Sequence, residues 1–313
     1  MTLKGNVVTM RLHSLLAATL SLAVACGGDG HGGPMITGLL VAGSSGPVYS
    51  SDDGGKAVSA KVIIQVTSAL SADPSGNVYF ANNELIKKVD ASGIMTTFAK
   101  PAFPLGLSND RAGNLYFGDI GGGSHTGVWN SDADGKLTRV ANTAYPNPIT
   151  AVDAAGTLYF ADGDSCDVAS ACTSKVQKRR GDGSQSTLVS SDDWIESMAV
   201  TGDGTIYVAF STKRDSNGDH YLTKILPSGD ITRILQDGCD NYILGIAADD
   251  AGSCYVLHRK NCLITTDAAG KATVYSIDSS LDTSDVVSSL AVSPAGTLYL
   301  STLHQIYRLV FPN

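Results

Sequence analysis

Six times along this chain of 313 residues, a glycine is followed three positions later by a tyrosine inside a short apolar run. Segments such as "ALSADPSGNVYFA" and "SLAVSPAGTLYLS" share one pattern, in which two short strands flank a tight turn that carries the glycine. The pairs are Gly76 and Tyr79, Gly113 and Tyr116, Gly156 and Tyr159, Gly204 and Tyr207, Gly252 and Tyr255, and Gly296 and Tyr299. Successive tyrosines are 37, 43, 48, 48 and 44 residues apart, a period typical of four-stranded propeller blades.

Composition supports an all-β protein. Hydrophobic residues make up 43% of the chain and charged residues 17%, which is sufficient for a packed core. The 34 glycines and the lack of a long helical periodicity favour short strands joined by turns. We therefore predict a six-bladed β-propeller over residues 35–313, in which strands a to d of each repeat run outward from the axis.

The last repeat lacks one strand. It contains expected strands at 288–292, 297–301 and 305–310, and no fourth strand follows them. Near the other end, "MITGLLVA" (35–42) has no repeat of its own and resembles "IMTTFA" (94–99), the outer strand of the first repeat. We predict that residues 35–42 supply the outer strand of the sixth repeat and close the ring, because an open sheet edge exposes unpaired backbone groups.

The first 34 residues indicate export. The run "LLAATLSLAVAC" is too short to span a bilayer, and it predicts a signal peptide over residues 1–25. The residues before Cys26 resemble a bacterial lipobox, which implies lipidation of Cys26 and a flexible tether over 26–34. The same triplet, Ala-Val-Ala, also fits ordinary cleavage and secretion. Both interpretations predict an extracytoplasmic protein, and the first predicts a cell-envelope lipoprotein that contacts the membrane only through its anchor.

Charge excludes one class of partner. The net charge is −8 and the isoelectric point is about 5.1, whereas phosphate backbones require a basic surface. We expect no nucleic-acid partner. The same charge disfavours adsorption to anionic membranes.

The cysteines fit an oxidising compartment. Cys166 and Cys172 flank a short polar loop and are expected to form a disulfide across it. Cys239 and Cys262 are predicted to lie on the same rim of the ring, which makes them the second candidate pair. A bond between Cys254 and Cys262 across a hairpin is the alternative, and the sequence leaves it open.

Two segments carry a family resemblance. The opening "MITGLLVAGSSGPVYSSDDGGKAVSAKV" and the following "LSADPSGNVYFANNELIKKVDASGIMTTFA" resemble the start of bacterial NHL-repeat propellers. "LHQIYRL" (303–309) is similar to the Asn-His-Arg-Ile element of that family, which implies a structural role for His304. The resemblance implies the propeller fold. It leaves function open, because such propellers include binding modules, sensor domains, lactonases and lyases.

Long loops and aromatic residues mark one rim as the candidate binding face. The connections between strands b and c are long at 118–127, 162–174 and 211–220, and all three emerge on one rim. Aligned aromatic residues are predicted near the axial opening on that rim, where they suit stacking against a sugar or an apolar ligand. Phe103, Trp194 and Tyr242 stand at the aligned position, thirteen residues before the repeated tyrosine, and Tyr145 is next to that position in its repeat. Packing between neighbouring blades is the other interpretation of these rings.

Three further residues complete the predicted site. Glu196 is the only charged residue at its aligned position in the six repeats. His125 and His220 come from two of the long loops and could approach each other. Solvated loop positions are the other interpretation of these histidines.

A catalytic alternative rests on a second resemblance. Gluconolactonase-like propellers bind a divalent cation through a Glu, two Asn and an Asp, and the cation polarises a lactone carbonyl. The nearest set in this chain is Glu196, Asn147, Asn241 and Asp285, none of which lies in a characteristic motif of that family.

Two hypotheses follow. The first is a binding module for a protein, peptide or glycan on the loop-rich rim, with no cofactor. The alternative is a lactone hydrolase or lyase at the axial opening that depends on a divalent metal such as calcium.

Overall fold

The structure is a computed structural model, and the protein is all-β. The regions described are 20–22, 34–44, 53–64, 70–163, 173–212, 218–236, 239, 242–278, 281 and 289–312. Within them, no helix is long and apolar enough to cross a bilayer. Cys26, Cys166, Cys172, Asn241 and Asp285 lie outside these regions, as does most of the expected signal peptide and tether.

Each repeat forms antiparallel strands in chain order, and repeats one to four give one sheet each. The strands of the first are β4 (Leu70–Ala72), β5 (Val78–Asn82), β6 (Leu85–Val89) and β7 (Ile94–Ala99). Those of the second are β8 (Pro104–Asn109), β9 (Leu115–Asp119), β10 (Gly127–Ser131) and β11 (Leu137–Ala141). Those of the third are β12 (Thr150–Val152), β13 (Leu158–Gly163), β14 (Ser174–Arg179) and β15 (Gln185–Ser191). Those of the fourth are β16 (Trp194–Val200), β17 (Ile206–Ser211), β18 (His220–Ile225) and β19 (Ile231–Gln236).

The last two repeats share an eight-stranded sheet through β2 (Met35–Ala42). The fifth repeat contains β20 (Ile243–Ala248), β21 (Cys254–His258), β22 (Cys262–Thr266) and β23 (Ala272–Ile277). The sixth contains β24 (Ser289–Val292), β25 (Leu298–Ser301) and β26 (Ile306–Val310). Two short strands, β1 (Leu20–Leu22) and β3 (Gly55–Lys56), pair with the outer strands β19 and β7.

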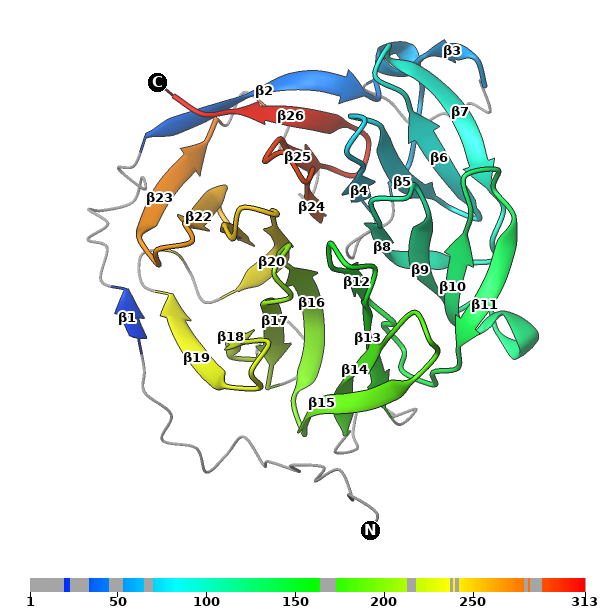
Figure 1. Ribbon diagram of the computed structural model, residues 1–313. Coiled ribbons are helices and arrows are strands. Elements are labelled where there is room, and N and C mark those ends of the chain that lie inside the picture. The colour runs from blue at the N-terminus through cyan, green and yellow to red at the C-terminus, as the bar shows by residue number, and fades with distance from the viewer. Residues whose placement is uncertain are drawn as a thin grey trace.

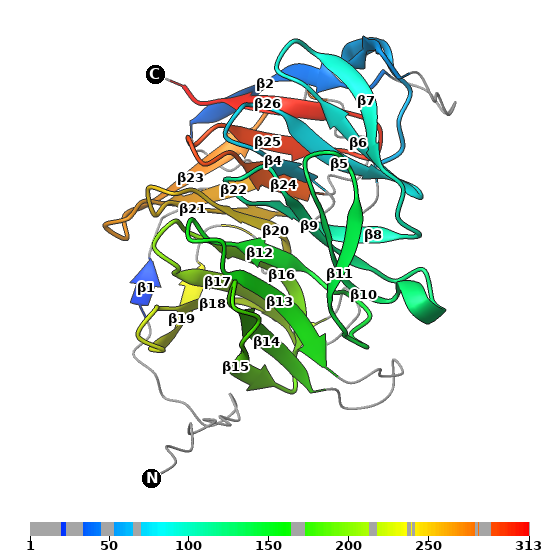
Figure 2. The ribbon, with the colours of Figure 1, turned by 45° about the vertical axis from the view of Figure 1, so that its right-hand side comes forward.

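The sheets are arranged around a common centre, as in a β-propeller (Figures 1 and 2). Their innermost strands contact one another in a continuous cycle. The order of this cycle is β4, β8, β12, β16, β20, β24 and again β4. The apolar core lies between neighbouring sheets, where the repeated tyrosines pack.

β2 lies at the outer position of the sixth repeat, beside β26 (Figure 1). It pairs antiparallel with β26 from Thr37 to Ala42, and its first two residues pair in parallel with β23. Ile36 and Ala42 are fully buried. β2 is thus joined by backbone hydrogen bonds to β26, the last strand of the sixth repeat.

An aspartate fixes several of the turns that carry the repeated glycine. Asp73 Oδ1 accepts hydrogen bonds from the backbone amides of Ser75 and Asn77, both at 2.9 Å. The other oxygen of this carboxylate accepts the hydroxyl hydrogen of Tyr79 at 3.2 Å. The partner of this tyrosine hydroxyl is therefore a side chain of the same repeat. The same carboxylate–hydroxyl pair recurs between Asp153 and Tyr159 and between Asp249 and Tyr255.

A half-buried ion pair attaches the segment around β3 to the first sheet. The ammonium of Lys87 on β6 is 1% exposed and donates to Asp53 Oδ1 at 2.9 Å and to Thr97 Oγ1 at 2.8 Å. Burial alone would raise the pKa of Asp53, but the hydrogen bonds from Lys87 and Thr97 outweigh it and lower that pKa below its ordinary value.

We expect Asp53→Asn to destabilise the protein near pH 7, by about 1 kcal/mol because the Asp53 carboxylate is half exposed. The native pKa is lowered, so the unfolded state binds more protons and the contribution of the pair rises with pH. The difference between wild type and variant should therefore shrink as the pH falls through the lowered pKa. Urea unfolding at pH 7 and at pH 3 measures it. A difference that is the same at both pH values would contradict this account.

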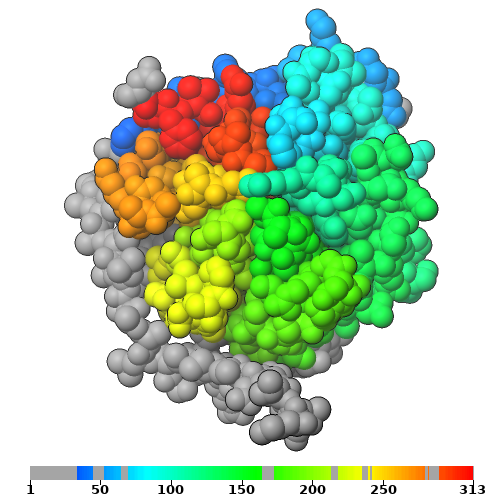
Figure 3. Space-filling view, in the orientation of Figure 1, coloured from blue at the N-terminus to red at the C-terminus, as the bar shows by residue number. Residues whose placement is uncertain are grey.

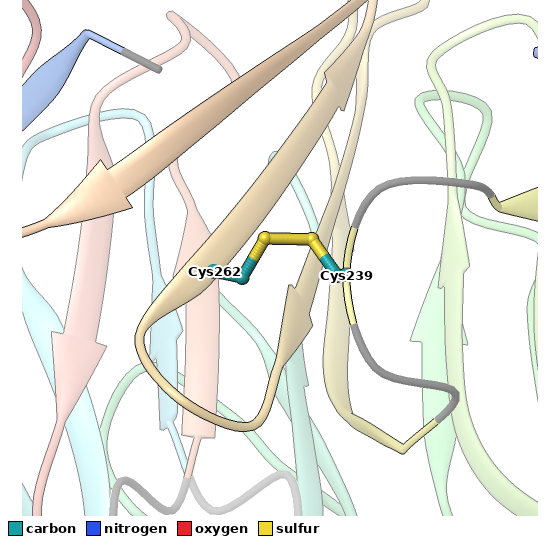
Figure 4. Close-up of a disulfide and its surroundings, with 2 residues drawn as sticks. All are labelled: Cys239 and Cys262. Atoms are coloured by element: carbon teal, nitrogen blue, oxygen red, sulfur yellow. A yellow bond between two sulfur atoms is a disulfide. The ribbon is translucent and has the colours of Figure 1, made fainter. Parts of the chain in front are cut away.

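One disulfide is formed in the described regions, between Cys239 and Cys262 (Figure 4). It links the connection between β19 and β20 to the start of β22, with 6.1 Å between the Cα atoms. The alternative bond between Cys254 and Cys262 is therefore not formed. Cys254 is a buried free thiol on β21, and burial raises its pKa.

Candidate functional site

The first strand of each repeat begins, and the second ends, at the same edge of the sheet. The predicted site residues lie at this edge, which we call the binding rim. Phe103 precedes β8, Trp194 begins β16, and Tyr242 precedes β20. His125 follows β9, and His220 begins β18. The structure divides these residues into two separate groups.

The first group consists of Phe103 and His125, and Phe103 borders a surface hollow of about 620 Å³ between the first two repeats. The ring of Phe103 lines it and is 41% exposed. Glu84, in the turn between β5 and β6, adds a carboxylate. Ile120, Gly121 and Gly122 form another part of the wall. We call this site the Phe103 hollow.

A buried carboxylate fixes the shape of the Phe103 hollow. Asp119 is 1% exposed and accepts hydrogen bonds from the amides of Ala102 at 2.8 Å, Phe103 at 2.9 Å and Gly121 at 2.9 Å. A Cβ atom at Gly121 would lie 2.1 Å from that of Ala102, so only glycine allows this approach. The backbone at Gly122 is open, because a Cβ atom added there would meet nothing within 4 Å. The wall of the hollow is therefore held in place by hydrogen bonds within the protein.

His125 lies beyond this hollow. It is exposed, and its ring stacks on that of Trp129 with 6.4 Å between centroids. The indole nitrogen of Trp129 donates to the carbonyl of His125 at 2.7 Å, and Arg139 lies 5.9 Å over the Trp129 ring. This arrangement fixes the end of the loop at 118–127. His125 and His220 belong to different groups, and no contact between them is found in the regions described.

The second group lies on the fourth repeat. Trp194, Ser211 and His220 are successive cross-strand partners at the end of this sheet. The ring of Trp194 contacts Tyr145 with 5.8 Å between centroids, and that of His220 contacts Tyr242 with 4.1 Å. These aromatic contacts join the third, fourth and fifth repeats along the binding rim.

Tyr145 supports this group from below. Its side chain is fully buried, and its hydroxyl accepts a hydrogen bond from the amide of Ile195 at 2.8 Å. A ligand on the rim could not reach the Tyr145 ring, so the structure is at odds with the predicted ligand contact and favours packing. The loop that carries Tyr145 folds inward. The backbone amide of Tyr145 donates a hydrogen bond to Thr143 Oγ1 in the same loop.

Sequence reasoning missed Arg259. Its guanidinium lies 3.4 Å from the centre of the Tyr242 ring, and its amide donates to the carbonyl of Tyr242 at 3.2 Å. Arg259 is exposed and sits in the tight turn between β21 and β22. The signal available in the sequence was this turn, "HRKN", which places a cation on the same rim as Tyr242.

Two of the four residues proposed for a cation lie close in the structure. Glu196 is half-buried at a β-bulge in β16, between Ile195 and Ser197. The side-chain amide of Asn147 donates to the carbonyl of Ile195 at 3.5 Å. Its oxygen, Oδ1, is buried and has no hydrogen-bond partner in the part of the chain that is described. Across that part, no group of three or more His, Cys, Asp or Glu residues could hold a metal ion.

Comparisons with known proteins identify the fold. No protein-family model and no curated protein matches the sequence. Among solved structures, the chain is similar to the gluconolactonase XC5397 of Xanthomonas campestris, with a TM-score of 0.58, 14% identity and coverage of 86% of this chain and 99% of that one. It is also similar to the calcium-binding protein regucalcin of Agrobacterium tumefaciens, with a TM-score of 0.58 and 16% identity. The match covers 80% of this chain and 93% of that one.

A third similar structure is an auxiliary nutrient binding protein of Bacteroides thetaiotaomicron, with a TM-score of 0.59 and 12% identity. The match covers 89% of this chain and 76% of that one. At these identities the likeness shows the fold and not the activity. The chain has the fold of this broad group of β-propellers.

Proposed function

We propose that this protein is a six-bladed β-propeller, closed by β2, that binds a glycan in the Phe103 hollow. The cycle of inner strands and the pairing of β2 with β26 support the blade count and the closure. An extracytoplasmic location belongs to the same proposal and rests on the sequence of residues 1–25 and on Cys26. Lipidation at Cys26 would keep the propeller at the membrane surface through its tether.

One observation carries the ligand class: an exposed aromatic ring and a carboxylate share a pre-formed hollow. The Phe103 ring offers an apolar face for the C–H groups of a sugar. Glu84 can accept hydrogen bonds from sugar hydroxyls, and the open backbone at Gly122 permits close approach. A rigid site also loses little conformational entropy on binding. A peptide would instead be expected to need a longer groove or an open strand edge.

We expect Phe103→Ala to weaken binding of the recognised oligosaccharide about tenfold or more, which corresponds to about 1.4 kcal/mol. The ligand would be found with an array of bacterial and plant oligosaccharides, and affinities would be measured by isothermal titration calorimetry. Leu226→Ala is the matched control, because Leu226 is a similarly exposed apolar residue in a turn on the opposite rim. If no oligosaccharide binds, or if both variants bind like wild type, the glycan proposal fails.

A second candidate function is a calcium-dependent lactone hydrolase at the binding rim near the axis. The unpaired oxygen of Asn147 beside the backbone next to Glu196 favours it, because hard cations take carboxylate and amide oxygens. Bound calcium would polarise the carbonyl of a lactone. In this chain, Glu196 would supply the charged ligand, and the hydrogen bond to Ile195 would orient Asn147. The likeness to a gluconolactonase and to a calcium-binding protein adds support.

Calcium should raise the melting temperature of wild type if this second function holds, because a ligand that binds only the folded state stabilises it. We expect the shift to disappear in Glu196→Gln and to persist in Glu84→Gln, a control on the same rim. Differential scanning fluorimetry with calcium and with a chelator measures it. If neither calcium nor the chelator changes the melting temperature of wild type, the hydrolase proposal fails and the glycan proposal is unaffected.

A further inference from the structure

Two repeats carry opposite charges at one equivalent position. Five residues before the repeated tyrosine stand Arg111 in the second repeat and Asp250 in the fifth. The other four repeats have uncharged residues there, namely Pro74, Ala154, Gly202 and Pro294. In the cycle of inner strands, β8 and β20 are three steps apart in either direction. The backbones of Arg111 and Asp250 thus belong to repeats on opposite sides of the ring.

The structure joins these two residues across the axis. A guanidinium nitrogen of Arg111 donates to a carboxylate oxygen of Asp250, although 139 residues separate them. Asp250 also packs against Gly202, where an added Cβ would lie 2.9 Å from its Oδ1. In the space-filling view, teal atoms of the second repeat meet yellow atoms of the fifth over the middle of the molecule (Figure 3). The ion pair therefore covers this end of the axial opening, opposite the binding rim.

A cavity of about 110 Å³ lies along the axis behind the ion pair. The last three residues of the inner strands line it, and the middle one is always serine or alanine. These middle residues are Ser71, Ser108, Ala151, Ala199, Ala247 and Ala291. Leucine, isoleucine and methionine side chains supply much of the remaining wall. Small residues at the middle position leave room for a small molecule among apolar groups.

One side-chain amide lines this cavity. Asn109 lies seven residues before its tyrosine, where the other repeats have alanine or valine. Both its Nδ2 and its Oδ1 are buried and have no hydrogen-bond partner in the regions described. The neighbouring hydroxyls of Ser108 and Thr150 bond to each other at 2.7 Å. A buried amide without partners is costly, so it indicates an occupant that can both donate and accept a hydrogen bond.

We propose that the axial cavity is a second binding site, which takes a small neutral molecule with a carboxamide or hydroxyl group against Asn109. The occupant is neutral because Asp250, the charged residue in the lining, is already paired with Arg111. Its apolar part would contact side chains such as Leu107 and Met198. The ion pair acts as a cover. The side chain of Arg111 is 52% exposed and that of Asp250 is 28% exposed. Salt therefore screens their attraction, and the ion pair opens readily.

Propionamide is a suitable probe, because it has a carboxamide and a short apolar chain. We expect saturable binding to wild type by NMR titration, and at least tenfold weaker binding to Asn109→Leu and to Asn109→Ala. The leucine fills the space and the alanine removes the amide, so at least one variant should fold like wild type. Asn130→Leu, on β10 and outside the cavity lining, is the matched control and should bind normally. Phe103→Ala should also bind propionamide normally, which separates this site from the glycan site.

The cover is tested by the variant that carries both Arg111→Gln and Asp250→Asn. We expect its affinity for propionamide to stay within threefold of wild type, while exchange of the ligand becomes at least tenfold faster. High salt should accelerate exchange in wild type and leave this variant unchanged. The proposal is overturned if wild type shows no saturable binding, if both Asn109 variants bind as wild type does, or if a crystal soaked with propionamide shows only water at the Asn109 amide.

Discussion

A chain that begins at residue 45, and therefore lacks β2, is expected to lose cooperative unfolding and to aggregate. The deletion removes five paired positions along β26 and the fully buried side chains of Ile36 and Ala42. Each backbone group left without a partner costs about 1 kcal/mol or more, and a whole domain is stable by only about 5–15 kcal/mol. The freed edge of β26 would also offer a template for pairing with other chains.

A chain that begins at residue 34 is the control, since it keeps β2 and lacks everything before Pro34. It should remain monomeric and melt within a few degrees of the full chain. Size-exclusion chromatography with light scattering and thermal unfolding by circular dichroism provide the two readouts. A soluble monomer that begins at residue 45 and melts at the temperature of the control would show that β2 does not close the ring.

The strands and turns were predictable because their determinants are local. The glycine of each turn has a positive φ, and the recurring Gly–Tyr spacing gives the register of strand b. The expected outer strand at 35–42 has the same bounds as β2. Another local signal went unused: an aspartate six residues before the tyrosine recurs in four repeats. These residues are Asp73, Asp110, Asp153 and Asp249. Their carboxylates accept hydrogen bonds from backbone amides of the glycine turns.

The site was harder to predict, because alignment gives positions along a strand and not the path of a loop. Phe103 and Tyr145 precede equivalent inner strands, yet the first is exposed and the second fully buried. Asp119 and Arg259 act through their contacts with Phe103 and Tyr242, and no spacing in the sequence encodes those contacts. The pairing of Arg111 with Asp250 depends on ring closure, which brings together residues more than a hundred positions apart. Residues contributed by separate repeats therefore require the three-dimensional structure.

Replacing both Cys239 and Cys262 by alanine is expected to lower the free energy of unfolding by about 3 kcal/mol, the loop-closure value for a separation of 23 residues. The melting temperature should fall by roughly 5–10 °C for a domain of this size. The bond ties the connection before β20 to β22, and Cys262 is fully buried against Ile264 and Val274. Its loss leaves this connection, which leads directly into Tyr242, without a covalent attachment.

Cys254→Ala separates the effect of the bond from that of removing any buried sulfur. Cys254 is buried and forms no disulfide, so this variant loses packing but no covalent link. In reducing buffer, wild type should approach the stability that the double variant has in the same buffer, while Cys254→Ala should shift by the same amount as wild type. Guanidinium unfolding with and without reductant makes both comparisons. If reductant leaves the unfolding midpoint of wild type unchanged even after free-thiol titration shows complete reduction, the Cys239–Cys262 bond contributes nothing to stability. The connection before β20 would then be held by packing around Cys262 alone.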